Sequence, residues 1–158
     1  MAIIKLNNQS ISSVTALPAG VGGKVLQVVT ATDATERSTT STSFVTGSNT
    51  LSLSITPSSA SNHILIQVSA TGYYNTSAQW GAFTLFKDGS NLITQGFSKL
   101  YNGNSDIGGA VQMAYKDTPG DTSSHTYDVR MKVSSTGTIY LNPNSGTYGL
   151  IRAYEIEG

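Results

Sequence analysis

The chain of 158 residues contains no cysteine. Disulfide bonds, thiolate zinc sites and cysteine nucleophiles are therefore excluded. Charged residues are also scarce: they make up 11% of the chain, where about 25% is usual in globular domains. Nine basic residues balance nine acidic residues, whereas a general nucleic-acid-binding protein needs a basic face that displaces counterions. We therefore expect no nucleic-acid partner.

Long apolar runs are missing as well. None approaches the roughly 20 residues that a membrane-spanning helix needs. The opening sequence MAIIKL is too short for the apolar core of a signal peptide, and no small-residue cleavage site follows it. We expect no membrane insertion, and we expect synthesis in a cytoplasm without processing.

The scarcity of charge does not indicate disorder. Serine and threonine replace the charged residues, and the chain also holds eight Tyr, four Phe and one Trp. Disordered chains are poor in aromatic and β-branched residues. A length of 158 residues suits a single domain with a real hydrophobic core.

The first 23 residues differ from the rest of the chain. Pro18 and the glycines of residues 20–23 predict a flexible joint or a tight bend. Before this joint, apolar side chains stand at irregular spacing among Asn, Gln and Ser, so we predict that they bind a partner: Ile3, Ile4, Leu6, Ile11 and Val14. We therefore divide the chain into an attachment arm, residues 1–23, and a folded domain, residues 24–158. The alternative is a disordered terminus.

After the joint, the sequence predicts one short strand after another. Residues 50–56, 62–71 and 125–134 alternate apolar and polar side chains, which is typical of half-buried strands. Asp88-Gly89 between two apolar runs predicts a hairpin turn. No window of helical length carries a period of 3.6 residues.

This pattern predicts an all-β fold, a two-sheet antiparallel sandwich. Eight or nine short strands in about 135 residues suit a jelly roll best. An immunoglobulin-type sandwich has fewer strands, and the chain lacks its Cys–Trp–Cys core.

Candidate catalytic groups are few. His63 and His125 each begin a predicted strand, and the chain has no H-x-H, H-E-x-x-H or G-x-S-x-G motif. Two polar residues at strand ends are the simpler interpretation. Asp117 and Asp121 could hold calcium through oxygen ligands, although ordinary turns favour the same residues. The sequence therefore predicts no enzyme activity, no cofactor and no metal.

Residues 72–80 are more suggestive of recognition. Tyr73, Tyr74 and Trp80 bracket a polar stretch with little charge. Aromatic rings beside amide side chains suit a sugar face or a protein partner, so these three residues form a predicted surface-recognition loop. The alternative is that Trp80 and one tyrosine plug the end of the sandwich. Residues 97–104 have a similar composition.

Several segments carry a resemblance when they are read in order. The chain begins with AIIKLNN and a Pro/Gly joint, and continues with KVLQVV, TSTSF, LSITPSS, ILI and FKDG, over residues 2–89. This order resembles small virion structural proteins of tailed bacteriophages, especially those of aquatic bacteria, among them decoration, head-fibre and tail-fibre proteins. The resemblance implies a trimeric β-sandwich on the virion surface, made in the host bacterial cytoplasm. It transfers no functional residue.

These observations lead to a functional expectation. We expect a trimeric capsid decoration or cement protein that its arm anchors to other virion proteins. The alternative is a short tail-fibre or fibre-tip protein that contacts a host receptor or surface glycan, although no repetitive shaft is present. A cellular carbohydrate-binding or hydrolytic module is disfavoured. Ile151, Ala153 and Tyr154 also favour a trimer, because one sandwich would leave apolar groups uncovered.

Overall fold

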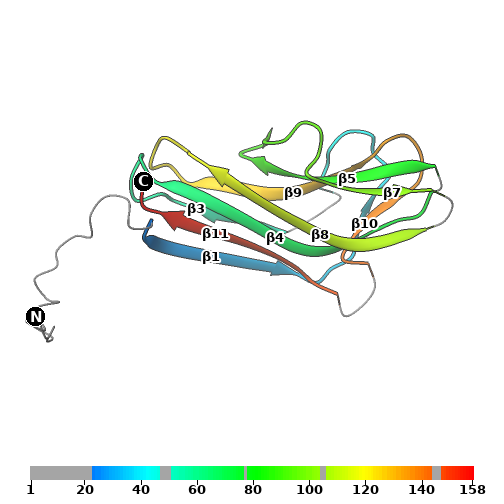
Figure 1. Ribbon diagram of the computed structural model, residues 1–158, viewed down its shortest axis with the longest axis horizontal. Helices are drawn as coiled ribbons and strands as arrows, with labels where there is room; N and C mark the ends of the chain where they lie inside the picture. Colours follow the sequence, from blue (N-terminus) through cyan, green and yellow to red (C-terminus); the bar gives the residue numbers. More distant parts are fainter. Residues whose placement is uncertain (1–22, 47–50, 77, 104–105, 144–146) are drawn as a thin grey trace, which may run out of the picture.

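A computed structural model describes residues 23–46, 51–76, 78–103, 106–143 and 147–158. Within these ranges the chain forms eleven β-strands and no helix, so no helix there could span a membrane. The strands form two antiparallel sheets that pack against each other (Figure 1). The predicted all-β, two-sheet sandwich is therefore confirmed, while the jelly roll stays a prediction.

Sheet A contains six strands. They are β1 (Val25–Asp33), β2 (Arg37–Thr39), β4 (His63–Tyr74), β8 (Ile107–Asp117), β10 (Ile139–Leu141) and β11 (Gly149–Ile156). The long strand β4 is its centre: β11 pairs with residues 63–69 and β10 with residues 72–74, while β8 pairs along the opposite edge. Because β11 also pairs with β1, β1 lies at one edge of the sheet.

Sheet B contains five strands. They are β3 (Ser52–Ile55), β5 (Gln79–Lys87), β6 (Ser90–Asn91), β7 (Ser98–Asn102) and β9 (His125–Val133). Strand β9 lies between β3 and β5, and β5 pairs with β6 and β7 on its other side. Asp88 and Gly89 connect β5 to β6 with φ values of 49° and 81°. Positive φ at both central residues matches a type I′ hairpin turn, so the predicted hairpin is confirmed.

The core lies between the two sheets. In β4 and β9, the apolar side chains that the alternation assigned to one face are buried: Ile64, Ile66, Val68, Ala70, Tyr127, Val129, Met131 and Val133. Each large aliphatic side chain contributes roughly 1.5–3 kcal/mol when it is fully buried. The small residue Gly81 lets the sheets approach closely, because a Cβ there would lie 2.4 Å from Cδ1 of Ile139.

The last strand, β11, corrects one expectation. Ile151 and Ala153 are fully buried within the sandwich itself, and Tyr154 is half-buried. One sandwich therefore covers Ile151 and Ala153, which were expected to need a trimer, and leaves Tyr154 partly exposed. The expectation was wrong for these two residues because the inward face of β11 packs into the core beside β4.

The two ends of the sandwich differ in what they contain. The start of β1 and the end of β11 meet at one end, where the N–H of Glu157 donates to the carbonyl of Lys24 at 2.9 Å (Figure 1). We call this the terminal end. The connection from β4 to β5 lies at the opposite end, which we call the distal end.

Candidate functional site

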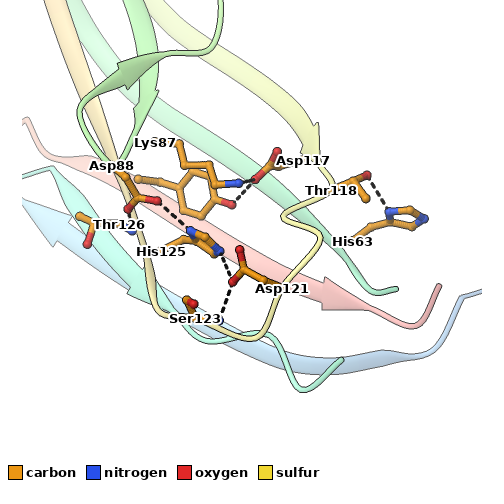
Figure 2. Close-up of polar contacts among 10 residues, drawn as sticks. His63, Lys87, Asp88, Asp117, Thr118, Asp121, Ser123, His125 and Thr126 are labelled. Carbon is orange, nitrogen blue, oxygen red and sulfur yellow. Dashed lines mark hydrogen bonds and ion pairs between the residues drawn. The ribbon is translucent and has the colours of Figure 1, made fainter. Parts of the chain in front are cut away.

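A cluster of charged side chains lies at the terminal end, centred on His125 at the start of β9 (Figure 2). Its Nδ1 is 2.7 Å from Oδ2 of Asp88, and its Nε2 is 3.2 Å from Oδ1 of Asp121. Both ring nitrogens therefore face carboxylate oxygens. When the imidazole is protonated, both nitrogens donate, and both contacts are then ion pairs.

The two carboxylates are held by the backbone as well. Oδ1 of Asp88 accepts the N–H of Thr126 at 2.8 Å. The hydrogen bond with His125, followed by that from Thr126, lowers the pKa of Asp88. Oδ1 of Asp121 accepts the N–H of Ser123 at 2.6 Å, and this bond contributes most to the lowered pKa of Asp121. Both carboxylates therefore favour the ionised form.

Asp117 belongs to a separate network beside this cluster. Its Oδ2 lies 2.8 Å from Nζ of Lys87 and accepts the hydroxyl of Tyr127 at 2.5 Å. Burial, together with the hydrogen bond to Asp117, raises the pKa of Tyr127 far above its usual value. Asp117 and Asp121 thus serve different partners and do not share a site. Among the described residues, no group of three or more His, Cys, Asp or Glu side chains could hold a metal ion.

The second histidine does not join the first. Nδ1 of His63 lies 3.0 Å from Oγ1 of Thr118, and Figure 2 shows this ring apart from His125. Both histidines begin strands, as the sequence predicted. Because both nitrogens of His125 are occupied by carboxylates, neither is placed to take a proton from a nucleophile. The cluster instead joins the β5–β6 turn to the start of β9.

Sequence reasoning missed a buried carboxylate at the same end. Glu155 in β11 is 1% exposed, and its Oε1 accepts hydrogen bonds from the N–H of Ser58 at 2.5 Å and from Nδ2 of Asn62 at 2.7 Å. Burial raises the pKa of Glu155, but the bonds from Asn62 and Ser58 outweigh it, so the pKa is lowered overall. Glu155 thereby ties the β3–β4 loop to the last strand.

The predicted recognition loop is not one surface. Tyr73 and Tyr74 both lie in β4, where successive side chains point to opposite faces. Tyr74 is fully buried, and its hydroxyl donates to the carbonyl of Thr136 at 2.6 Å. The expectation that Tyr74 contacts a partner was wrong for this reason. The alternation of residues 62–71, extended by three residues to Tyr74, would have indicated it.

Tyr73 and Trp80 lie on the outer faces of different sheets. Tyr73 packs against Tyr140 in sheet A, with ring centroids 5.6 Å apart. Its hydroxyl donates to the carboxylate of Asp106, and this hydrogen bond raises the pKa of Tyr73. Trp80 follows the opposite register from the buried Phe83 and Leu85 of β5, so it faces outward from sheet B.

The outer face of sheet A carries a hollow of about 400 Å³. It is lined by Gln67, Val68, Ser69, Gln112, Met113, Ala114, Leu150 and Arg152. Nε2 of Gln112 donates to Oγ of Ser69 at 2.7 Å across its floor. Arg152 is the charged residue in this lining, so the hollow does not offer the acid–base pair that hydrolysis requires.

Strand β1 presents apolar side chains to solvent. Val25 is 51% exposed, Leu26 37% and Val28 53%. Its register against β11 shifts between Val25 and Gln27, and no strand of the described residues pairs with its other edge. An exposed apolar edge strand is a template for pairing with another chain. The sequence predicted strands after the joint but not that the first of them lies at the edge.

The predicted partner-binding residues of the arm lie outside the described residues: Ile3, Ile4, Leu6, Ile11 and Val14. The described chain begins at Gly23, and β1 begins at Val25. Lys24 alone therefore separates the arm from the apolar strand.

The chain was compared with known proteins. It matches no model of a known protein family and no curated protein sequence.

Proposed function

We propose that this chain is a non-enzymatic structural protein of a bacteriophage virion, specifically a trimeric decoration protein on the capsid surface with a jelly-roll sandwich. The sequence segments that resemble such virion proteins support the setting. Residues 1–23 and strand β1 together form the attachment and assembly region. The sandwich is then the body that stands on the particle.

The exposed strand β1 is the observation that carries this proposal. It is nine residues long, and its exposed side chains Val25, Leu26 and Val28 contrast with the buried apolar groups of the other strands. A second chain that covered these groups would gain roughly 1.5–3 kcal/mol for each well-buried side chain. Ordering the backbone on binding costs about 1–2 kcal/mol per residue, so one arm alone would bind modestly.

A trimer would overcome this modest affinity. Three copies in a closed ring would bury three equivalent β1 surfaces. They would also bring three arms to the same particle, and linked binding events raise the overall avidity. This arrangement suits a module that must remain on a capsid.

A second candidate is a short tail-fibre or fibre-tip protein that contacts the host surface. The observation that favours it is the outer face of sheet B, where Trp80 stands beside lysine side chains. This face belongs to the layer opposite β1, so a particle-bound protein could present it outward.

Copy number on purified virions tests the two candidates. A denaturing gel that shows hundreds of copies per particle supports decoration, and a few tens or fewer indicate a fibre. A variant that lacks residues 1–17 should fold into a cooperatively melting β-domain but no longer join particles. Absence of the chain from virions would contradict the proposal. Full occupancy by the truncated variant would contradict the role of residues 1–17 as the anchor.

A further inference from the structure

The outer face of sheet B combines aromatic rings with lysine side chains. Nζ of Lys99 lies 4.6 Å from the ring centroid of Trp80, and Nζ of Lys132 lies 5.6 Å from the same ring. Lys132 also lies 4.6 Å from the ring centroid of Phe44. Cation–π contacts of this length hold an ammonium group against a ring face. Trp80 therefore fixes two positive charges on one face.

The strand register explains why these groups meet. Ala82 of β5 pairs with Lys99 of β7 on one side and with Lys132 of β9 on the other. Trp80 lies two residues before Ala82, on the same face, and pairs directly with Tyr101 of β7. Tyr101 is 63% exposed. The lysine–aromatic face, as we name Trp80, Lys99, Tyr101 and Lys132, is thus built on three neighbouring strands.

The two lysines also carry unneutralised charge. Among the described residues, neither Lys99 nor Lys132 forms an ion pair with a carboxylate. Arg130 on the same face differs, because its Nε lies 2.7 Å from Oδ2 of Asp128. In a chain with 11% charged residues, two neighbouring cations without a counter-charge mark a place where an anion would be stabilised.

We propose that the lysine–aromatic face binds an acidic saccharide. The exposed ring of Tyr101 can stack on the apolar face of a sugar. The ammonium groups of Lys99 and Lys132 can donate charge-assisted hydrogen bonds to a carboxylate, phosphate or sulfate group on that sugar. Trp80 acts as a positioning residue, since it holds both ammonium groups and is itself partly covered by them.

The charge count favours a saccharide over a single-stranded nucleic acid. A nucleic-acid site gains its affinity from the release of many counterions, which needs a run of basic side chains. This face offers two unpaired lysines on a chain of zero net charge. A neutral sugar, in turn, carries no negative group with which the two ammonium groups could pair.

This inference deepens the host-contact candidate but does not rest on attachment to a virion, because no residue of β1 takes part. The purified full-length chain can therefore be tested directly. Its oligomeric state should be unaffected by substitutions at the lysine–aromatic face. A failure of saccharide binding would leave the assembly proposal intact, and a monomeric chain could still bind a saccharide.

The experiment is isothermal titration of the full-length chain with a fixed set of probes. The acidic probes are hexagalacturonate, a heparin hexasaccharide and a pentamannose phosphate, which distinguish carboxylate, sulfate and phosphate. The comparison probes are neutral maltohexaose and the oligonucleotide dT6. At least one acidic saccharide should bind about tenfold more tightly than maltohexaose and dT6, equivalent to about 1.4 kcal/mol.

The double variant K99A/K132A and the single variant Y101A should each weaken that binding about tenfold. The matched control is K116A, which removes an exposed lysine from β8 in the other sheet and should leave binding unchanged. The proposal is overturned if no acidic saccharide exceeds maltohexaose, if dT6 binds more tightly, or if K116A weakens binding as much as K99A/K132A.

The positioning role of Trp80 has its own readout. Ring currents should shift the side-chain methylene protons of Lys99 and Lys132 upfield in NMR spectra. Trp80→Ala should abolish the shift of Lys99, reduce that of Lys132, which also lies over Phe44, and weaken saccharide binding, while Trp80→Phe should retain part of each effect. If Trp80→Ala abolishes the Lys99 shift but leaves binding unchanged, Trp80 does not position the lysines for the ligand.

Discussion

The two ends of the sandwich are held together by different physical interactions. At the terminal end, carboxylates connect loops to strands: the exposed Asp88 and Asp121 bind His125, and the buried Glu155 binds Asn62. At the distal end, the hydroxyl of Tyr73 also binds a carboxylate, that of Asp106, but the contacts around the buried Tyr74 are neutral. The hydroxyl of Tyr74 binds a backbone carbonyl, and Oδ1 of Asn75 accepts the N–H of Thr138 at 2.8 Å.

This difference predicts that the two ends respond differently to acid and to the loss of side-chain volume. Charged hydrogen bonds are strong but depend on ionisation. Neutral contacts and buried aromatic rings are insensitive to pH but depend on packing. The terminal end should therefore respond to acid, and the distal end to loss of side-chain volume.

The largest effect should come from breaking the distal end. Tyr74→Ala removes a fully buried ring, and such truncations cost about 3–5 kcal/mol of the free energy of unfolding. Tyr74→Phe keeps the ring and loses only the hydrogen bond to the carbonyl of Thr136, which costs about 1 kcal/mol. Urea denaturation measures both. Equal losses in the two variants would show that the hydroxyl, and not the ring, holds this end.

A smaller loss should follow from breaking the terminal end at Glu155. Glu155→Ala removes the acceptor of Ser58 and of the buried side chain of Asn62, which costs about 1–3 kcal/mol. Glu155→Gln retains a carbonyl oxygen and should cost less. If Glu155→Ala unfolds at the same urea concentration as the wild type, the carboxylate does not tie the β3–β4 loop to β11.

Acid should weaken the terminal end selectively. The folded-state pKa values of Asp88, Asp121 and Glu155 are lowered, so their contribution to stability is present above the unfolded pKa of about 4. It is lost as the pH falls through the folded-state values. The free energy of unfolding should therefore decrease as the pH falls below about 5.

Variants can show whether this decrease in the free energy of unfolding comes from Asp88 and Asp121. The double variant D88N/D121N should have a flatter acid dependence than the wild type. The matched control Glu157→Gln, which removes an exposed carboxylate at the same end, should keep the wild-type slope. A D88N/D121N slope as steep as the wild-type slope would place the acid sensitivity elsewhere.

The smallest effect on folding should come from the exposed strand beside the terminal end. Val28→Glu places a charge at a position that is 53% exposed, and surface substitutions usually change stability by less than about 0.5 kcal/mol. Thermal melting at a protein concentration low enough to disfavour assembly measures this. A loss of several kcal/mol would mean that Val28 belongs to the folded core of one chain.

Sequence alternation predicted the sandwich because local patterns report which face of a strand is buried. It assigned the inward residues of β4 and β9, and the Asp88-Gly89 turn, correctly. It could not place β1 at an edge, because an edge position depends on which strands pair. Strand β7 was missed, since Leu100 is its one fully apolar inward residue.

The candidate site was less predictable than the fold. His125 and Asp88 are 37 residues apart, and their contact follows from the hairpin and the β5–β9 register, not from any local motif. Glu155 gave no signal, because a carboxylate in a strand usually faces solvent. Lys99 and Lys132 meet at Trp80 only through the pairing of both strands with Ala82.

The mass of the full-length chain in solution tests the central claim, assembly through β1, most directly. Light scattering at micromolar concentration should give three times the chain mass for the wild type and for Ala114→Glu, a charge placed at an exposed position on the opposite edge strand β8. Val28→Glu should give the mass of one chain. A wild type that is monomeric, or a Val28→Glu variant that stays trimeric, would contradict the account.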